Sequence, residues 1–113
     1  LQQIFEAVLE NKPFILNVYR SVKREQVENY LYSLTYQLIE GGVEEQSENL
    51  MVTEEQKKFI ADFYKYSFVG VMLDWIKRGM KEAPEEIANM VCVTMHGNVG
   101  NSLRNMEKEG NKD

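Results

Sequence analysis

Residues 63–76, FYKYSFVGVMLDWI, decide the fold of this chain, because charge occurs only at Lys65 and Asp74 and apolar side chains fall on every side of a helical projection. The run is shorter than the roughly 20 residues that cross a bilayer and longer than an ordinary strand of about 5 or 6. It is therefore predicted to be a buried central helix. A helix that is apolar on all faces needs cover on all faces, either from its own chain or from a second copy of the molecule.

The composition favours one globular, helix-rich domain spanning residues 1–113. The chain has 113 residues, of which 43% are hydrophobic and 27% charged, and its net charge is −5. An acidic segment is poorly suited to tracking nucleic acid phosphates, so this part of the molecule is not expected to bind DNA. There is no signal peptide or membrane-spanning run, and a single cysteine, Cys92, cannot form an internal disulfide. A cytoplasmic location is expected.

Helical spacing of apolar residues accounts for most of the chain, so the expected fold class is all-α with about five helices. Pro13 interrupts the first pattern, because the residue before a proline is driven out of the helical region, and Pro84 suits the first turn of the last helix. Thr53 and Gln56 have the spacing of a capping box, in which each side chain satisfies the other's backbone donor. The predicted helices cover residues 1–10, 13–22, 25–40, 53–81 and 84 onward, with residues 105–113 frayed.

Glycines are expected to set several helix ends. Gly41 and Gly42 are predicted to stop the third helix, because a left-handed cap favours glycine, and residues 43–52 lack periodicity and are predicted to form a loop. Gly97 and Gly100 each weaken the last helix by about 1 kcal/mol relative to alanine. They mark either a break in that helix or a close approach of another backbone.

Side chains capable of catalysis are few. Cys92 and His96 lie four residues apart on the last helix, but a metal site needs three or four ligands and a nucleophile pair needs an orienting group. A core thiol and a helix-end imidazole are the favoured interpretation. The paired glutamates fall in polar loops or first helical turns, where they complement the helix dipole. The chain is predicted not to be an enzyme and to bind no metal or cofactor.

Asp74 interrupts the apolar run of the long helix and has two explanations. The favoured one is an intrahelical ion pair with Arg78 at i+4 or Lys77 at i+3. The other is a carboxylate that faces a dimer partner or a ligand, which would be costly to bury unless it is paired.

Three apolar faces of the long helix exceed what the other predicted helices can cover. Ser67 and Gly70 are small enough for a close helix crossing, so a homodimer is expected, in which this helix and the last one form half of a four-helix bundle. The aromatic residues of the chain are interpreted mainly as core. An apolar ligand pocket lined by tyrosine, phenylalanine and methionine remains the alternative.

The stretch from Phe63 to Met80, followed by Pro84-Glu85-Glu86-Ile87, closely resembles the C-terminal regulatory domain of TetR-type transcriptional regulators. The similarity is greatest to a Firmicutes-type subgroup with a tyrosine-aromatic-glycine-tryptophan pattern in the long helix. Residues 11–21 resemble the same subgroup, although Ala83 stands where an Asp or Ser cap is more usual. The resemblance implies an all-helical domain that dimerises through its last two long helices and holds a small-molecule pocket in each protomer. It also implies an N-terminal helix-turn-helix domain that reads operator DNA, which is not found in residues 1–113, so the chain is expected to be a fragment.

Residues 1–113 are accordingly predicted to be the effector-sensing and dimerisation domain of a TetR-type regulator, with a homodimer partner and a small apolar or aromatic effector. The alternative is a helical protein-interaction module that docks a different partner and has no cavity. The residues predicted to bind the effector are Tyr19, Tyr30, Phe59, Phe63 and Tyr66. The residues predicted to form the dimer interface are Ser67, Gly70, Val71, Asp74, Ile87, Val91, Thr94 and Asn98. The two faces of the 63–76 helix could be exchanged in this assignment.

Overall fold

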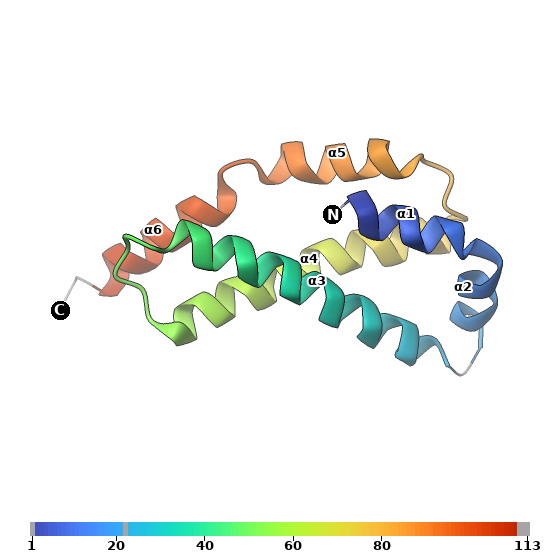
Figure 1. The fold of residues 1–113 in the computed structure, drawn as a ribbon, viewed down its shortest axis with the longest axis horizontal. Coiled ribbons are helices and arrows are strands. Elements are labelled where there is room, and N and C mark those ends of the chain that lie inside the picture. The colour runs from blue at the N-terminus through green and yellow to red at the C-terminus, as the bar shows by residue number, and fades with distance from the viewer. Residues whose placement is uncertain (1, 22, 111–113) are drawn as a thin grey trace.

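A computed structural model describes residues 2–21 and 23–110, and these residues form helices without a strand (Figure 1). The predicted all-α fold class is confirmed. The described helices are α1 (Gln2–Glu10), α2 (Lys12–Tyr19), α3 (Arg24–Gln46), α4 (Glu54–Lys77), α5 (Pro84–Met95) and α6 (Asn98–Gly110).

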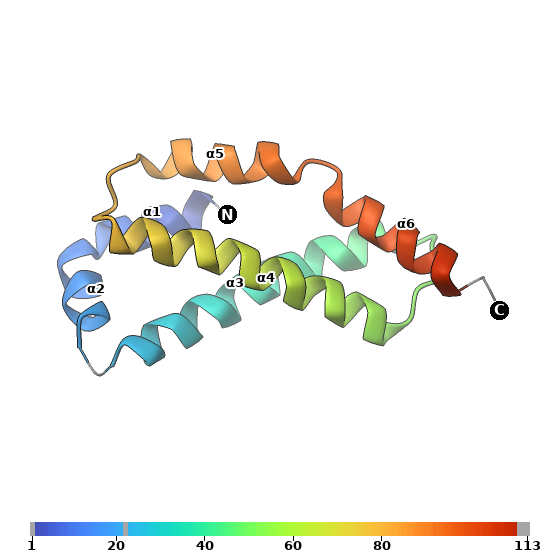
Figure 2. The same ribbon diagram turned by 180° about the vertical axis from the view of Figure 1, so that it is seen from behind.

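The two longest helices, α3 and α4, form an antiparallel hairpin to which the other helices are attached (Figures 1 and 2). Helices α1 and α2 lie at one end of this hairpin, and α6 packs on both long helices at the other end. Helix α5 packs chiefly against α1. The result is an elongated molecule with extents of 52 × 28 × 18 Å.

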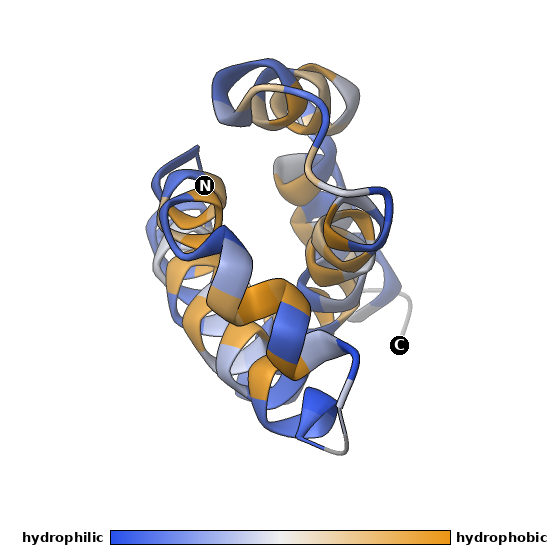
Figure 3. Cartoon of the chain, turned by 90° about the vertical axis from the view of Figure 1, so that its right-hand side faces the viewer, coloured by the Kyte–Doolittle hydropathy of each residue, from blue (hydrophilic) through white to orange (hydrophobic). Residues whose placement is uncertain are grey.

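Two apolar clusters hold the helices together. The first surrounds Trp75, whose ring meets that of Phe5 edge to face with 5.1 Å between centroids. The second joins α3, α4 and α6 and includes Val43, Ile60 and Leu103. Hydrophobic and hydrophilic residues alternate along the helices, as Figure 3 shows. The predicted burial of residues 63–76 is therefore only partial: one side of α4 lies in the core and the other is exposed.

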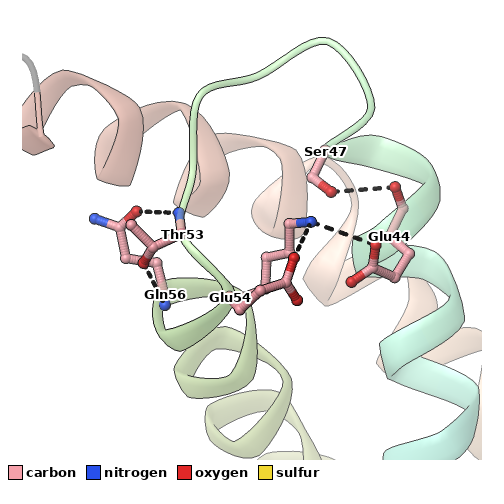
Figure 4. Close-up of polar contacts among 6 residues, drawn as sticks. Glu44, Ser47, Thr53, Glu54 and Gln56 are labelled. Atoms are coloured by element: carbon pink, nitrogen blue, oxygen red, sulfur yellow. Dashed lines mark hydrogen bonds and ion pairs between the residues drawn. The ribbon is translucent and has the colours of Figure 1, made fainter.

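The start of α4 matches the predicted capping box. The Thr53 backbone N–H donates to Gln56 Oε1 at 2.9 Å, and the Gln56 N–H donates to Thr53 Oγ1 at 3.1 Å (Figure 4). Lys57 adds ion pairs to Glu54 at 3.1 Å and to Glu44 at 3.4 Å, which connect the end of α3 to the start of α4.

The predicted stop at Gly41 and Gly42 is wrong, because α3 continues to Gln46. Val43 is 1% exposed and extends the buried stripe of the helix into the second cluster, so tertiary packing outweighs the weak helix propensity of the two glycines. The predicted loop over 43–52 is correspondingly shorter.

Helix α4 ends at Lys77, earlier than the predicted Lys81, and Gly79 is the cause. Gly79 has a φ of +88°, and its N–H donates to the Ile76 carbonyl at 3.0 Å while the Met80 N–H donates to the Trp75 carbonyl at 2.9 Å. This is the Schellman arrangement, completed by the burial of Met80 and Trp75 in one cluster.

The last predicted helix is broken at Gly97, which has a φ of +79° and separates α5 from α6. Gly100 is a position of close approach, since a Cβ there would lie 3.1 Å from Gln46 Oε1. The expected fraying from residue 105 is not seen up to Gly110. Glu107 accepts a hydrogen bond from the Met51 N–H at 2.6 Å and helps to hold α6 in place. Residues 1, 22 and 111–113 lie outside the described part of the chain.

Candidate functional site

A half-open cavity of about 530 Å³ lies among α1, α2 and α3, and is called here the α1–α3 cavity. Its volume falls within the range of about 300–1,000 Å³ that is typical of small-molecule sites. Most of its wall is apolar, and the polar lining residues are Asn11, Lys23, Gln26 and Tyr30. The apolar lining residues are Ile4, Ala7, Val8, Phe14, Ile15, Val18, Val27, Leu31 and Leu34.

Helix α2 forms the wall of this cavity that contains no buried residue. Its described residues are all at least partly exposed, and the Phe14 side chain is 65% exposed although it lines the cavity. Ile4, Val8 and Leu31, on the walls contributed by α1 and α3, are by contrast buried in the Trp75 cluster. The walls from α1 and α3 are therefore buried more deeply than the α2 wall, of which Ile15 packs at the edge of the Trp75 cluster.

The five residues predicted to bind an effector are not brought together. Tyr30 alone lines the α1–α3 cavity, whereas Phe59 and Phe63 border a small groove between α4 and α6. The Tyr19 ring lies under the Arg24 guanidinium, 5.4 Å from it, and Tyr66 is 58% exposed. The sequence patterns that mark the cavity wall are the apolar stripes of residues 4–8, 14–18 and 27–34, whose helical spacing is equally typical of a core.

Tyr66 belongs to an aromatic cluster around one lysine. The Lys65 ammonium lies 4.4 Å from the Tyr66 ring centroid and 5.5 Å from that of Tyr36, and it forms an ion pair with Asp62 at 3.1 Å. The Tyr32 ring meets Tyr66 edge to face at 5.5 Å. These contacts join α3 to α4 and border an open groove lined by Tyr32, Ser33, Tyr36, Gln37, Lys58, Asp62 and Lys65.

One side of α4 carries an apolar and small-residue surface that the described chain leaves uncovered. Phe59, Phe63 and Tyr66 are 61%, 57% and 58% exposed, which is unusual for large aromatic side chains. Gly70 has no atom within 4 Å of the position that a Cβ would occupy. We call this surface the exposed α4 face, and its residues are Phe59, Phe63, Tyr66, Ser67, Gly70, Val71 and Asp74.

Six of the eight residues predicted to form the dimer interface are exposed, and two are not. Ser67, Gly70, Val71 and Asp74 all lie on the exposed α4 face, and Thr94 and Asn98 are exposed too. Ile87 instead packs against the Trp75 cluster and Val91 is buried, because the inner side of α5 is turned toward α1. The exposed apolar residues of α5 are Met90 and Val93, at 62% and 68%.

Asp74 forms the predicted ion pair, with 2.9 Å between its Oδ2 and the Arg78 Nε. Arg78 also contacts Glu82 at 2.7 Å, and hydrogen bonds from Arg78 hold the pKa of Glu82 below its ordinary value. Cys92 is exposed, so its interpretation as a core thiol is wrong, and Cys92 and His96 border a shallow apolar groove. Among the described residues, no group of three His, Cys, Asp or Glu could hold a metal ion.

Residues 1–97 match the family described as transcriptional regulator C-terminal region, of the TetR type. The match spans most of the chain, so the chain belongs to this family, and the predicted resemblance is confirmed. No curated protein and no solved structure matches it significantly. The described residues are thus part of a transcriptional regulator, and regulators of this family generally dimerise and bind effectors.

No helix in residues 2–21 and 23–110 has the length and apolar character needed to span a bilayer.

Proposed function

We propose that this chain is the effector-sensing and dimerisation domain of its TetR-type regulator. The observation that carries the proposal is the presence of two separate features in one small domain. The α1–α3 cavity lies among the first three helices, and the exposed α4 face lies on the last long helix together with Met90 and Val93 of α5. A sensor domain needs both a site for a signal and a surface through which the signal reaches a partner subunit.

The cavity supports the sensing role because it is mostly apolar, of suitable volume and half-open to solvent. Of the predicted effector ligands, Tyr30 is retained in this proposal. Phe59, Phe63 and Tyr66 are assigned to the partner-facing surface, because they lie on the exposed side of α4.

The exposed α4 face supports dimerisation because its aromatic and small residues share one side of a helix. A stable interface buries about 800 Å² on each partner, and large aromatic side chains are its most common anchors. Small residues at Ser67 and Gly70 would allow the two α4 helices to approach closely. The proposed interface comprises the exposed α4 face with Met90, Val93, Thr94 and Asn98.

Light scattering tests the dimer. The expected mass at micromolar concentration is twice the 13.2 kDa of one chain. Phe63→Asp should dissociate the dimer, because it places a charge in an apolar contact, whereas Leu38→Asp, at an exposed apolar residue of α3, should leave the mass unchanged. A wild-type mass of one chain would reject the dimer and favour the alternative module that docks a different protein.

A neutral apolar fluorophore such as N-phenyl-1-naphthylamine tests the cavity. Its fluorescence should rise on binding, and Ala7→Phe should reduce binding because the new ring fills the space that Ala7 borders. Gln3→Phe provides the matched control, since Gln3 lies on the same helix, is exposed and does not line the cavity. Equal binding by the two variants would show that the fluorophore binds elsewhere, and absence of binding by the wild type would reject the sensing role.

A further inference from the structure

The polar part of the α1–α3 cavity carries charge of one sign. Among the 13 lining residues, Lys23 is the only one with a full charge, and no Asp or Glu lines the cavity. The chain as a whole has 18 acidic residues and a net charge of −5. A cavity that is free of carboxylates and bordered by a lysine therefore differs in electrostatic character from the rest of the molecule.

Lys23 has no ion-pair partner among residues 2–21 and 23–110. Its backbone is fixed, since its N–H donates to Ser21 Oγ at 3.0 Å and its carbonyl accepts from the Gln26 N–H at 3.0 Å. Two carboxylates at the start of α3, Glu25 and Glu28, line a neighbouring groove instead, where Glu28 pairs with Arg24 at 3.6 Å. Lys23 thus lines an apolar cavity from a fixed backbone position, and its ammonium is available to an incoming anion.

The remaining polar lining residues are neutral. Gln26 and Tyr30 can donate hydrogen bonds, and Asn11 uses its Nδ2 to donate to the Ala7 carbonyl at 2.9 Å. Two donors and one ammonium beside an apolar wall suit a molecule that has an apolar body and a single acidic group. A cationic head would be repelled by Lys23, and an uncharged one would leave the ammonium unused.

We propose that the α1–α3 cavity binds an amphipathic acid, with the apolar body against α1 and α3 and the anionic group paired with Lys23. The inference rests on the proposed sensing role and specifies its ligand class. Because Lys23 is exposed, its pair with the ligand is worth about 1 kcal/mol rather than the several of a buried pair.

The test is displacement of the neutral fluorophore by decanoate, decanol and decylamine, which share one apolar chain and differ in the head group. Decanoate should bind about fivefold more tightly than decanol, and decylamine more weakly than either. Lys23→Gln should remove the preference for decanoate, while Lys81→Gln, at an exposed lysine that does not line the cavity, should retain it. The preference should also shrink at about 1 M salt, where charges are screened within about 3 Å.

The outcomes separate this inference from the sensing role. Equal affinities for the three compounds, or a preference that survives Lys23→Gln, would overturn the inference, and so would failure of all three to displace a bound fluorophore. In each of these cases the fluorophore and its loss in Ala7→Phe would still support the cavity. The sensing role falls if the fluorophore does not bind, or if Ala7→Phe and Gln3→Phe bind it equally.

Discussion

Gly70 offers the sharpest test of how α4 is used, because its effect on one protomer and its effect on a dimer have opposite signs. Gly70 lies within α4, and a Cβ at this position meets no atom within 4 Å in the chain. Glycine inside a helix is less favourable than alanine by about 0.5–1 kcal/mol. In an isolated protomer, Gly70→Ala and Gly70→Leu should therefore both raise the free energy of unfolding by about that amount.

In a dimer that crosses at Gly70, the leucine variant meets the opposing helix. Overpacking of a well-packed contact costs about 1–3 kcal/mol, and two-fold symmetry places the new side chain in the interface twice. The expected loss of about 2–6 kcal/mol corresponds to a dissociation constant raised by about 30-fold or more. The alanine variant should weaken the dimer less.

Sedimentation equilibrium over a range of protein concentrations measures the dissociation constant, and urea unfolding of the dilute protein measures the protomer. Gly41→Leu is the matched control, because Gly41 is also an exposed helical glycine with open space at its Cβ position but lies on α3. An unchanged dissociation constant in Gly70→Leu would show that α4 does not cross its partner at this residue.

Three further changes test the fold. Gly79→Ala should lower the free energy of unfolding by about 1 kcal/mol, because Gly79 has a φ of +88°. Gly41→Ala in α3 should instead raise the free energy of unfolding by about 0.5–1 kcal/mol. Urea midpoints of the two variants that move in the same direction would contradict this prediction. Thr53→Ala removes the acceptor for the Gln56 N–H and should cost about 1 kcal/mol, measured by thermal unfolding. The hydrogen bond from Lys58 holds the pKa of Asp62 below its ordinary value, so this carboxylate stabilises the fold above its unfolded pKa, and the contribution is lost as pH falls through the folded pKa. Asp62→Asn should therefore cost about 0.5–1 kcal/mol at neutral pH and nothing in strong acid, as urea unfolding at the two pH values would show.

Several helix boundaries were predicted correctly, because the interactions that set them act between residues close in sequence. The capping box at Thr53 and Gln56 needs only those two side chains, and Pro84 needs only its own ring. The two helix ends that were predicted wrongly have different causes, one a packing contact distant in sequence and the other a local Schellman turn. Gly41 and Gly42 remain helical because Val43 packs into the second cluster, while Gly79 ends α4 because Met80 can turn back onto the Trp75 cluster.

The candidate sites were harder to predict for a related reason. Apolar residues at helical spacing look the same whether they fill a core, line a cavity or face a partner. Val27 and Leu34 border the cavity although their spacing is equally typical of a core, and Phe59 and Phe63 were predicted to bind an effector although they face outward. Only the packing of α5 against α1, which no local pattern encodes, shows that Ile87 and Val91 point inward.

The position of α1 between the cavity and α5 has a thermodynamic consequence. Ile4 and Val8 border the cavity and belong to the same buried cluster as Ala88 of α5, so a molecule that repositions α1 acts directly on a helix of the proposed dimer surface. Two equilibria that share one structural element are coupled reciprocally. Because the proposed dimer has two cavities, the factor by which saturating ligand changes the dimer dissociation constant must equal the product, over both cavities, of the ratio between the ligand affinities of dimer and protomer. The measured ligand affinity would then vary with the concentration of the protein itself.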